Sequence, residues 1–197
     1  MKKQNIYRLT VAGMLIALEI ILAFTPIGYL KIGLLSITFL TIPIIIGGIT
    51  SGVAVSTLLG LTFGITSFVQ CFGMDAFGTA LFQINPVFTF IMCVVSRTLM
   101  GFLCGLIYKG LTQTKLPQTL KAGAAAFSAP FLNTLFFMAC LIAFFWRTDM
   151  IQALAAGKNV FLFLVTLVGV NGLVEWAVCT VVGTVIAVPV AKAIRKQ

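Results

Sequence analysis

The sequence predicts an all-α membrane protein, a compact bundle of six transmembrane helices with both the N- and the C-terminus in the cytoplasm. Hydrophobic residues make up 60% of the chain and charged residues only 9%, and the mean hydropathy is +1.15. The apolar residues also gather in long runs, and about twenty of them span a bilayer as a helix. With 197 residues, the chain has room for one membrane domain over 1–197 and none for a soluble domain beside it.

Six apolar segments follow one another along the chain. We place the expected spans at Ile6–Phe24, Ser36–Ile49, Val53–Val69, Asn85–Tyr108, Leu120–Trp146 and Asn159–Ala191. The second of these is short for a span. Three longer connections, Thr25–Leu35, Gln70–Ile84 and Arg147–Lys158, fall at one end of the predicted bundle. Connections of this kind often carry lids or binding loops.

Basic residues gather at the opposite set of helix ends. If the N-terminus lies inside, the cytoplasmic face holds nine of them: Lys2, Lys3, Arg8, Lys109, Lys115, Lys121, Lys192, Arg195 and Lys196. The outer face holds only Lys31, Arg147 and Lys158. This bias predicts that both termini are cytoplasmic, and it explains the net charge of +9 without nucleic-acid binding.

Residues that would support enzyme, metal or cofactor chemistry are scarce. The chain has no histidine and four acidic residues, and its cysteines are far apart in the sequence. We therefore expect no metal site and no enzyme, and we expect free buried thiols at Cys71, Cys93, Cys104, Cys140 and Cys179. No phosphate-binding Gly-x-x-x-x-Gly-Lys-Ser/Thr run is present. No cofactor is expected in this chain, and ATP would have to be hydrolysed by partner subunits.

Four strongly polar side chains lie near the middle of apolar segments: Arg97, Asn133, Asn171 and Glu175. A charge or amide at bilayer depth costs on the order of 2.5 kcal/mol or more without a partner or a wet cavity. Arg97 and Asn171 each lie 12 residues after the expected start of their helix, and Asn133 lies 13 before the end of its own. The three are thus at similar depth, and Glu175 shares a helix face with Asn171. The pattern predicts a pocket for a small polar solute.

Two interpretations of this polar set remain open. Arg97 and Glu175 form a structural buried ion pair, with the asparagines bridging helices, or the set binds a ligand with a carboxylate or amide. Both hold together if the ligand competes for Arg97. The pocket would extend to Gln70 and Asn85 at its mouth and to Trp176 in its wall, although Asn85-Pro86 also predicts a helix start.

Small residues recur at four-residue steps on several of the segments. Gly60 with Gly64, and Gly101 with Gly105, predict close packing between helices of this chain. Gly13 and Ala17 form a flat patch on the first span, and two partners suit it equally: a neighbouring helix of the same chain or another membrane subunit. Glu19, on the same span, is a further buried charge whose role stays open.

Taken together, these features resemble the S components of energy-coupling-factor transporters, most closely those of the pantothenate-type branch. The stretches that carry the likeness are Phe39–Gly47, Gly60–Phe68, Asn85-Pro86 leading to Ser96-Arg97 and Gly101, Asn133-Thr134, and the pair Asn171 and Glu175.

The resemblance implies a subunit of the bacterial cell membrane that captures a water-soluble vitamin, pantothenate above all, from outside. A membrane T component and two cytoplasmic ATPases would drive its release inward. Arg97 would meet the carboxylate of the vitamin, Asn133 and Asn171 its amide and hydroxyls, and Glu175 a hydroxyl or Arg97 itself. The family usually docks through Ala-x-x-x-Ala on its first helix, where this chain has Gly13 and Ala17.

A different function remains compatible with the residues alone. A stand-alone secondary transporter or channel for a small polar solute would use the buried charges of Arg97 and Glu175 for coupling. The sequence contains no evident inverted repeat of broken helices, which argues against this alternative.

Overall fold

The computed structural model describes residues 2–26, 28–32 and 35–195, with side chains described except at 2–5, 30–32, 35–37, 170–171 and 193–195. Five stretches in this part of the chain are long and apolar enough to cross a membrane: Ile6–Ala23, Val53–Gln70, Pro86–Thr112, Gln118–Phe145 and Gly172–Lys192. A sixth span results if Asp149–Ala155 and Val160–Gly169, which are bent by 79°, are taken together. The predicted all-α membrane fold is confirmed.

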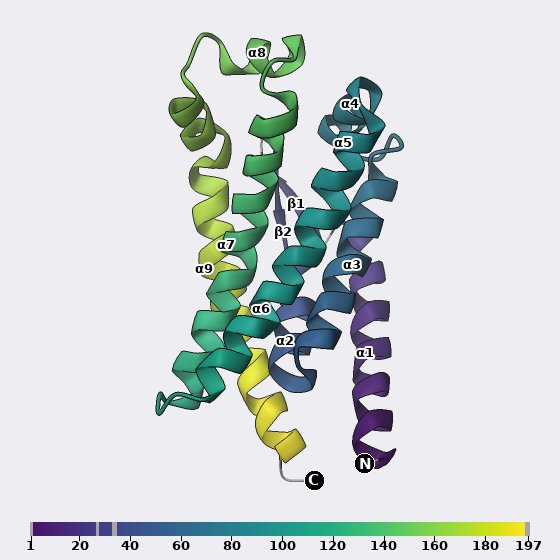
Figure 1. Ribbon diagram of the computed structural model, residues 1–197, viewed down its shortest axis with the longest axis vertical. Coiled ribbons are helices and arrows are strands. Elements are labelled where there is room, and N and C mark those ends of the chain that lie inside the picture. The colour runs from purple at the N-terminus through teal and green to yellow at the C-terminus, as the bar shows by residue number, and fades with distance from the viewer. Residues whose placement is uncertain (1, 27, 33–34, 196–197) are drawn as a thin grey trace.

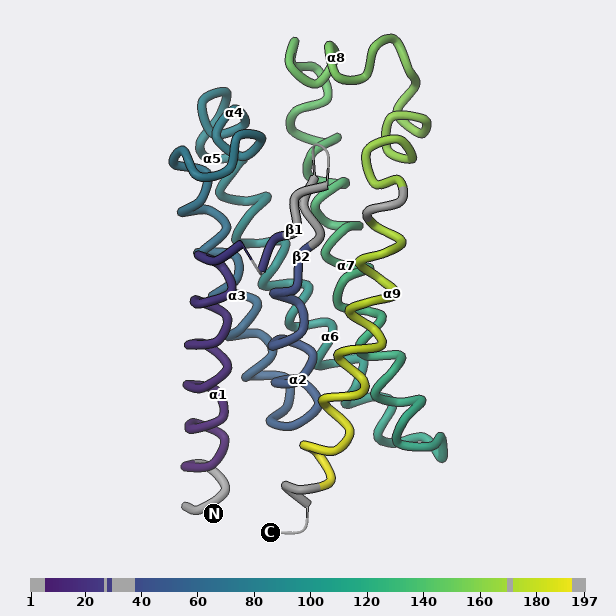
Figure 2. Tube along the Cα trace, turned by 180° about the vertical axis from the view of Figure 1, so that it is seen from behind, coloured from purple at the N-terminus to yellow at the C-terminus, as the bar shows by residue number. Residues whose placement is uncertain are grey.

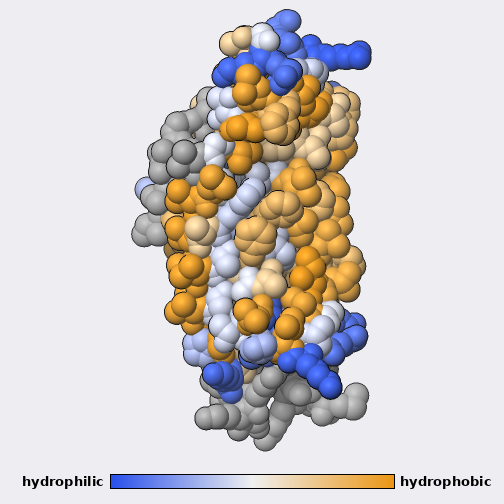
Figure 3. Space-filling view, turned by 90° about the vertical axis from the view of Figure 1, so that its left-hand side faces the viewer, coloured by the Kyte–Doolittle hydropathy of each residue, from blue (hydrophilic) through white to orange (hydrophobic). Residues whose placement is uncertain are grey.

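The long helices run side by side along one axis of the molecule (Figure 1). They are α1 (Lys2–Ala23), α3 (Val53–Gln70), α6 (Ser96–Thr112), α7 (Gln118–Phe145) and α9 (Val160–Arg195). The start of α1 and the end of α9 lie at the same end of the bundle (Figures 1 and 2). Apolar side chains cover the middle of the surface in Figure 3, and hydrophilic ones gather at both ends, as a membrane belt requires.

The second expected span has a different structure from the one predicted. Strands β1 (Tyr29–Ile32) and β2 (Leu35–Thr38) form an antiparallel hairpin, and α2 (Thr41–Ser51) follows it along the long axis (Figure 2). Eleven helical residues rise only about 16 Å, so α2 alone is too short to cross a bilayer. The alternation of apolar and polar residues in Leu35–Phe39 has the period of a strand, which explains why the helix begins at Thr41 instead of Ser36.

The other two expected connections also contain helices. Asp75 caps the start of α4 (Ala76–Ile84), because its Oδ2 accepts a hydrogen bond from the Gly78 N–H at 2.7 Å. Helix α8 (Asp149–Ala155) lies in the last connection. These helices and the short α5 (Pro86–Phe90) lie at the end of the molecule opposite the termini (Figure 1).

The fourth expected span is one continuous stretch with an irregular turn inside it. Asn85 caps α5 by accepting hydrogen bonds from the N–H groups of Val87 and Phe88, and Pro86 occupies the first position, which confirms the predicted helix start. A π-helical turn, η1 (Ile91–Val95), then joins α5 to α6. Such turns interrupt the regular backbone ladder and are frequent at functional sites.

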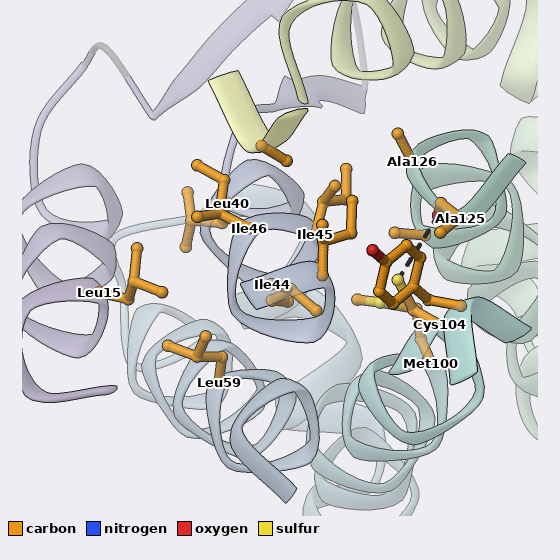
Figure 4. Packing of buried hydrophobic residues seen from close by; sticks show 14 of the residues in the cluster. Leu15, Leu40, Ile44, Ile45, Ile46, Leu59, Met100, Cys104, Ala125 and Ala126 are labelled. Carbon is orange, nitrogen blue, oxygen red and sulfur yellow. Dashed lines mark hydrogen bonds between the residues drawn. The ribbon is translucent and has the colours of Figure 1, made fainter. Parts of the chain in front are cut away.

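The main hydrophobic core surrounds α2 (Figure 4). Ile44 and Ile45 are fully buried there, together with Leu59 of α3 and Met100 of α6. Ala125 of α7 lies beside Met100 on one side of α2, and Leu15 of α1 lies on the other side (Figure 4). This core fills the half of the bundle nearer the termini, so the space available for a ligand lies in the other half.

Glycines bring α3 into backbone contact with η1 and α6. A Cβ atom on Gly60 would lie 2.5 Å from the Arg97 carbonyl oxygen and 3.2 Å from the Gly101 Cα. A Cβ on Gly64 would lie 2.8 Å from the Val94 Cα. The predicted internal packing of these small-residue pairs is therefore confirmed.

Helix α9 is interrupted in its first half. The φ of Gly169 is 41°, in the left-handed region that favours glycine, and its ψ of −142° is not helical. The break separates Val168 from Gly172, and both residues line the cavity described next.

Candidate functional site

A cavity of about 660 Å³ occupies the half of the bundle away from the termini. It lies among the end of α1, the β1–β2 hairpin, the end of α3, η1 and α6, α7 and α9. Its polar lining consists of Thr25, Tyr29, Thr38, Ser67, Gln70, Asp75, Arg97, Asn133, Thr134 and Glu175. Its apolar and sulfur-bearing lining includes Cys71, Met74, Phe77, Met92, Cys93, Phe137, Met138 and Val168. Volume and lining suit a small, partly polar molecule.

Arg97 is held rigidly at the wall of this cavity. It is only 8% exposed, and its Nη1 donates hydrogen bonds to the carbonyl oxygens of Met92 at 2.9 Å and Cys93 at 3.3 Å. Both carbonyls belong to η1, where the backbone N–H of Ser96 donates to the Ile91 carbonyl oxygen and not to that of Met92, as it would in a regular α-helix. The guanidinium carbon also lies 5.0 Å from the ring centroid of Phe63 and 5.6 Å from that of Phe137.

These contacts leave part of the guanidinium free. The Arg97 Nε is buried and has no hydrogen-bond partner among the described residues. A buried, unsatisfied donor on a charged group is costly, so an acceptor that reached the Arg97 Nε after a small side-chain movement would be bound favourably. A planar guanidinium that is already oriented loses little entropy when it binds a carboxylate.

Glu175 approaches the cavity from α9. It is 6% exposed, and its Oε2 accepts a hydrogen bond from the backbone N–H of Thr38, at the end of β2, over 3.3 Å. The Cys179 thiol lies 3.5 Å from the Thr38 carbonyl oxygen, so two contacts tie the hairpin to α9. The second carboxylate oxygen, Oε1, is buried without a partner in the described part of the chain.

The buried ion pair that the sequence left open is not formed. Arg97 and Glu175 both have described side chains, yet no nitrogen of the first lies within 4.0 Å of an oxygen of the second. Two buried side chains of opposite charge thus border the same space, each with an unused polar atom. Desolvated charges of this kind are stabilised by a ligand or by water that completes their hydrogen bonds.

Two further polar atoms in the lining have no protein partner. The Oδ1 of Asn133 on α7 and the hydroxyl of Tyr29 in β1 are buried and make no hydrogen bond within the described residues. Together with Arg97 Nε and Glu175 Oε1, they supply donors and acceptors from four separate elements. The cavity therefore has polar groups in its lining inside an apolar bundle, and Arg97, Asn133 and Glu175 are among its lining residues.

Of the other expected site residues, one lines the cavity, two do not, and one has no described side chain. Gln70 lines the cavity, but its Nε2 donates to the Ala23 carbonyl oxygen and joins the ends of α3 and α1. Asn85 and Trp176 are not part of the lining: Asn85 caps α5, and the Trp176 Nε1 donates to the Thr134 hydroxyl at 3.3 Å. The side chain of Asn171 lies outside the described residues.

Sequence reasoning missed several residues of this site. Tyr29 and Thr38 enter through the hairpin, which was expected to be a connection and part of a span. Asp75 lines the cavity from the cap of α4. The pairing of β1 with β2 places Tyr29 opposite Thr38, and this depends on a tertiary arrangement that hydropathy does not report. Only the strand-like alternation after Leu35 could have revealed it.

Two features of α1 lie outside the cavity. Gly13 and Ala17 are exposed, and no described atom beyond α1's own backbone lies within 4 Å of a Cβ built on Gly13. Of the two partners considered for this patch, a helix of the same chain is therefore not in contact with Gly13. Glu19 is fully buried, with both carboxylate oxygens unpartnered among the described residues, and it does not belong to the cavity lining.

The arrangement of a rigid cationic anchor and unpartnered polar atoms in a membrane bundle agrees with one comparison. The family model for the substrate-specific component of ECF transporters matches residues 7–187 of this chain. The chain belongs to this family. No curated protein matches the sequence.

This ECF substrate-specific component, or S component, is a multi-pass membrane protein. Its family consists of transporter subunits and is not a family of enzymes. ECF S components bind a small substrate and work with a T component and ATPases.

Proposed function

We propose that this S component captures a water-soluble vitamin, with pantothenate favoured, from outside a bacterial cell and delivers it inward. The observation that carries the proposal is Arg97, which lines the cavity. Its guanidinium is oriented by η1 and two phenyl rings, and its Nε has no hydrogen-bond partner among the described residues. A carboxylate is the group that complements such an anchor best, because the hydrogen bonds are charge-assisted and the Arg97 side chain is largely buried.

The rest of the polar lining suits the remainder of such a molecule. Asn133 Oδ1 and Glu175 Oε1 accept hydrogen bonds from hydroxyl or amide N–H groups, and the Tyr29 hydroxyl donates or accepts. Phe77 and Phe137 offer apolar surface to an aliphatic part of the ligand. Each charge-assisted hydrogen bond contributes about 1.5–3 kcal/mol. Because about 1.4 kcal/mol changes the dissociation constant tenfold, two or three such bonds lower it by several orders of magnitude.

Delivery needs an energy source, for which we propose a T component and two cytoplasmic ATPase subunits that hydrolyse ATP. The positive-inside bias supports cytoplasmic termini, and the cavity then lies in the outer half of the membrane. The exposed patch of Gly13 and Ala17 on α1 is the proposed docking surface for the T component, because small residues let another helix approach closely.

The direct test is titration of purified protein in lipid nanodiscs with pantothenate, by calorimetry. We expect binding by the wild-type chain and at least about 30-fold weaker binding by Arg97→Ala, because loss of one partner of a buried charged contact costs about 2 kcal/mol or more. Arg147→Ala is the matched control, since it removes the same side chain from an exposed position outside the cavity.

Two results would contradict parts of this proposal. If the folded wild-type protein binds neither pantothenate nor any other water-soluble vitamin, the proposed substrate class is wrong. If Arg97→Ala fails to fold, as judged by its elution profile and thermal melting, Arg97 is structural; a ligand-protected melting screen of the wild type then still tests the substrate class.

A further inference from the structure

Two cysteines from distant parts of the chain meet at the cavity wall. The Sγ atoms of Cys71 and Cys93 lie 3.8 Å apart, although 22 positions separate the two residues in the sequence. Cys71 follows the last residue of α3, and Cys93 is the central residue of η1. Both thiols are free and buried against protein, and both residues line the cavity.

The contact is specific to this pair. The Cys104 thiol lies 3.5 Å from the Ala125 carbonyl oxygen, and the Cys179 thiol lies 3.5 Å from that of Thr38. Cys140 is half-buried on α7. All five cysteines have described side chains, and within this set Cys71 and Cys93 form the one sulfur–sulfur contact.

We propose that Cys71 and Cys93 are a modification site, a dithiol that is converted to an intramolecular disulfide by small disulfide molecules entering the cavity. One protein thiol, as its thiolate, attacks the reagent R–S–S–R, forms a mixed disulfide and releases one RSH. The second protein thiol then attacks the protein sulfur of that mixed disulfide and releases the other RSH. The protein loses two hydrogen atoms, and the reagent is reduced to two thiols.

The geometry favours ring closure over a stable adduct. Sulfur atoms in a disulfide are about 2 Å apart, so closure requires an approach of roughly 2 Å, which rotation of the two side chains can supply in part. Cys71 lies at the end of a helix and Cys93 in a π-helical turn, where the backbone adjusts more readily than in the middle of an α-helix. The cavity supplies the route for a reagent that could not reach a fully enclosed thiol.

The bridge would act directly on the substrate site. The carbonyl oxygens of Met92 and Cys93 hold the Arg97 guanidinium, so a bond at Cys93 would fix the turn that orients Arg97 to the outer end of α3. The oxidation state of the pair would thus set how freely two walls of the cavity move relative to each other. This part of the inference is independent of which substrate the cavity binds.

The test is to treat the purified full chain in nanodiscs with bis(2-hydroxyethyl) disulfide and to count thiols after denaturation with a polymer-linked maleimide. The wild type is expected to fall from five reactive thiols to three, to lose two hydrogen atoms in intact mass and to recover both on reduction. Cys104→Ser and Cys179→Ser are the matched controls and are expected to form the same bridge. Cys71→Ser is expected to keep one hydroxyethylthio adduct on Cys93 and to form no bridge.

The outcomes separate clearly. Five thiols remaining in folded wild-type protein, a bridge that persists in Cys71→Ser, or a disulfide-linked dimer would each overturn the proposal. Peptide mapping of oxidised wild-type protein, in which the peptide with Cys71 should be joined to the peptide with Cys93, gives the same answer if the serine variants do not fold.

Discussion

Two pairs of small residues, each with four-residue spacing, differ in exposure in this S component: one is buried between helices, and the other lies on an exposed helix face. On α3, Gly60 faces α6 and Gly64 faces η1 so closely that a Cβ on either would enter the space of the facing backbone. On α1, Gly13 and Ala17 are exposed, and no described atom outside the helix's own backbone approaches within 4 Å of a Cβ on Gly13. The same spacing thus closes the bundle in one place and leaves a flat free surface in the other.

The difference matters because the internal pair also supports the site. The Cβ position of Gly60 is 2.5 Å from the carbonyl oxygen of Arg97, the residue that anchors the proposed ligand. The contact between α3 and α6 therefore fixes the backbone from which Arg97 projects. The α1 pair has no such connection to the cavity lining. Substitutions at the two pairs should separate folding and binding from coupling to partner subunits.

The largest effect is expected for Gly60→Leu. The added side chain has no space between α3 and α6. Because it would press against backbone, which cannot move aside easily, we expect the free energy of unfolding to fall by about 3 kcal/mol or more. We expect loss of the folded protein, measured by thermal unfolding in detergent and by the fraction that elutes as a single species.

The control for this prediction is Gly110→Leu, near the end of α6. No described atom beyond α6's own backbone lies within 4 Å of its Cβ position, so the free energy of unfolding should change by no more than about 0.5 kcal/mol. Equal stability of the two leucine variants would show that α3 and α6 can separate without cost.

A large effect of a different kind is expected for Gly13→Trp. The indole extends from an exposed face, so the melting temperature and ligand binding should match those of the wild type, whereas uptake by the assembled transporter should be lost. The measurement is vitamin uptake by vesicles that contain the complete transporter, together with calorimetric binding by the isolated chain.

Val185→Trp is the matched control, because it places the same ring on an exposed position of α9. Uptake should persist in this variant. Wild-type uptake by Gly13→Trp would show that the α1 patch is not the docking surface. The difference in exposure between the two small-residue pairs would then not correspond to a difference in function.

Hydropathy and helix-end chemistry predicted much of this fold. The expected start of the third span at Val53 and the cap at Asn85 are those of the structure, because a glycine turn and an Asn-Pro start are local signals. The hairpin was missed, since a short apolar stretch such as Ser36–Ile49 fits a helix and a strand equally well. The break at Gly169 was also not predicted, because a glycine inside an apolar run is common in membrane helices.

The sequence identifies those lining residues whose side chains are costly to place in a membrane. Arg97 and Glu175 were recognised because charges inside apolar segments are expensive, and both line the cavity. Tyr29 and the contact of Cys71 with Cys93 were not, because aromatic residues and cysteines carry no such penalty. Nor does a small-residue pair reveal whether it faces the bundle or the lipid, and only the arrangement of all helices decides that.

The smallest effect, and the finest test of the comparison, is expected for Gly123→Ala on α7. Its Cβ position is 3.8 Å from the Thr184 hydroxyl oxygen, an ordinary van der Waals contact, so this glycine is intermediate between the buried and the free pair. Alanine favours a helix over glycine and restricts the unfolded chain, so the variant should be more stable by roughly 0.5 kcal/mol. The same change at Gly60 should cost about 1–3 kcal/mol, because the added carbon meets backbone. Unfolding in detergent measures both variants under one condition. Opposite signs would show that local space decides the role of each glycine, and equal signs would show that helix propensity outweighs packing in this bundle.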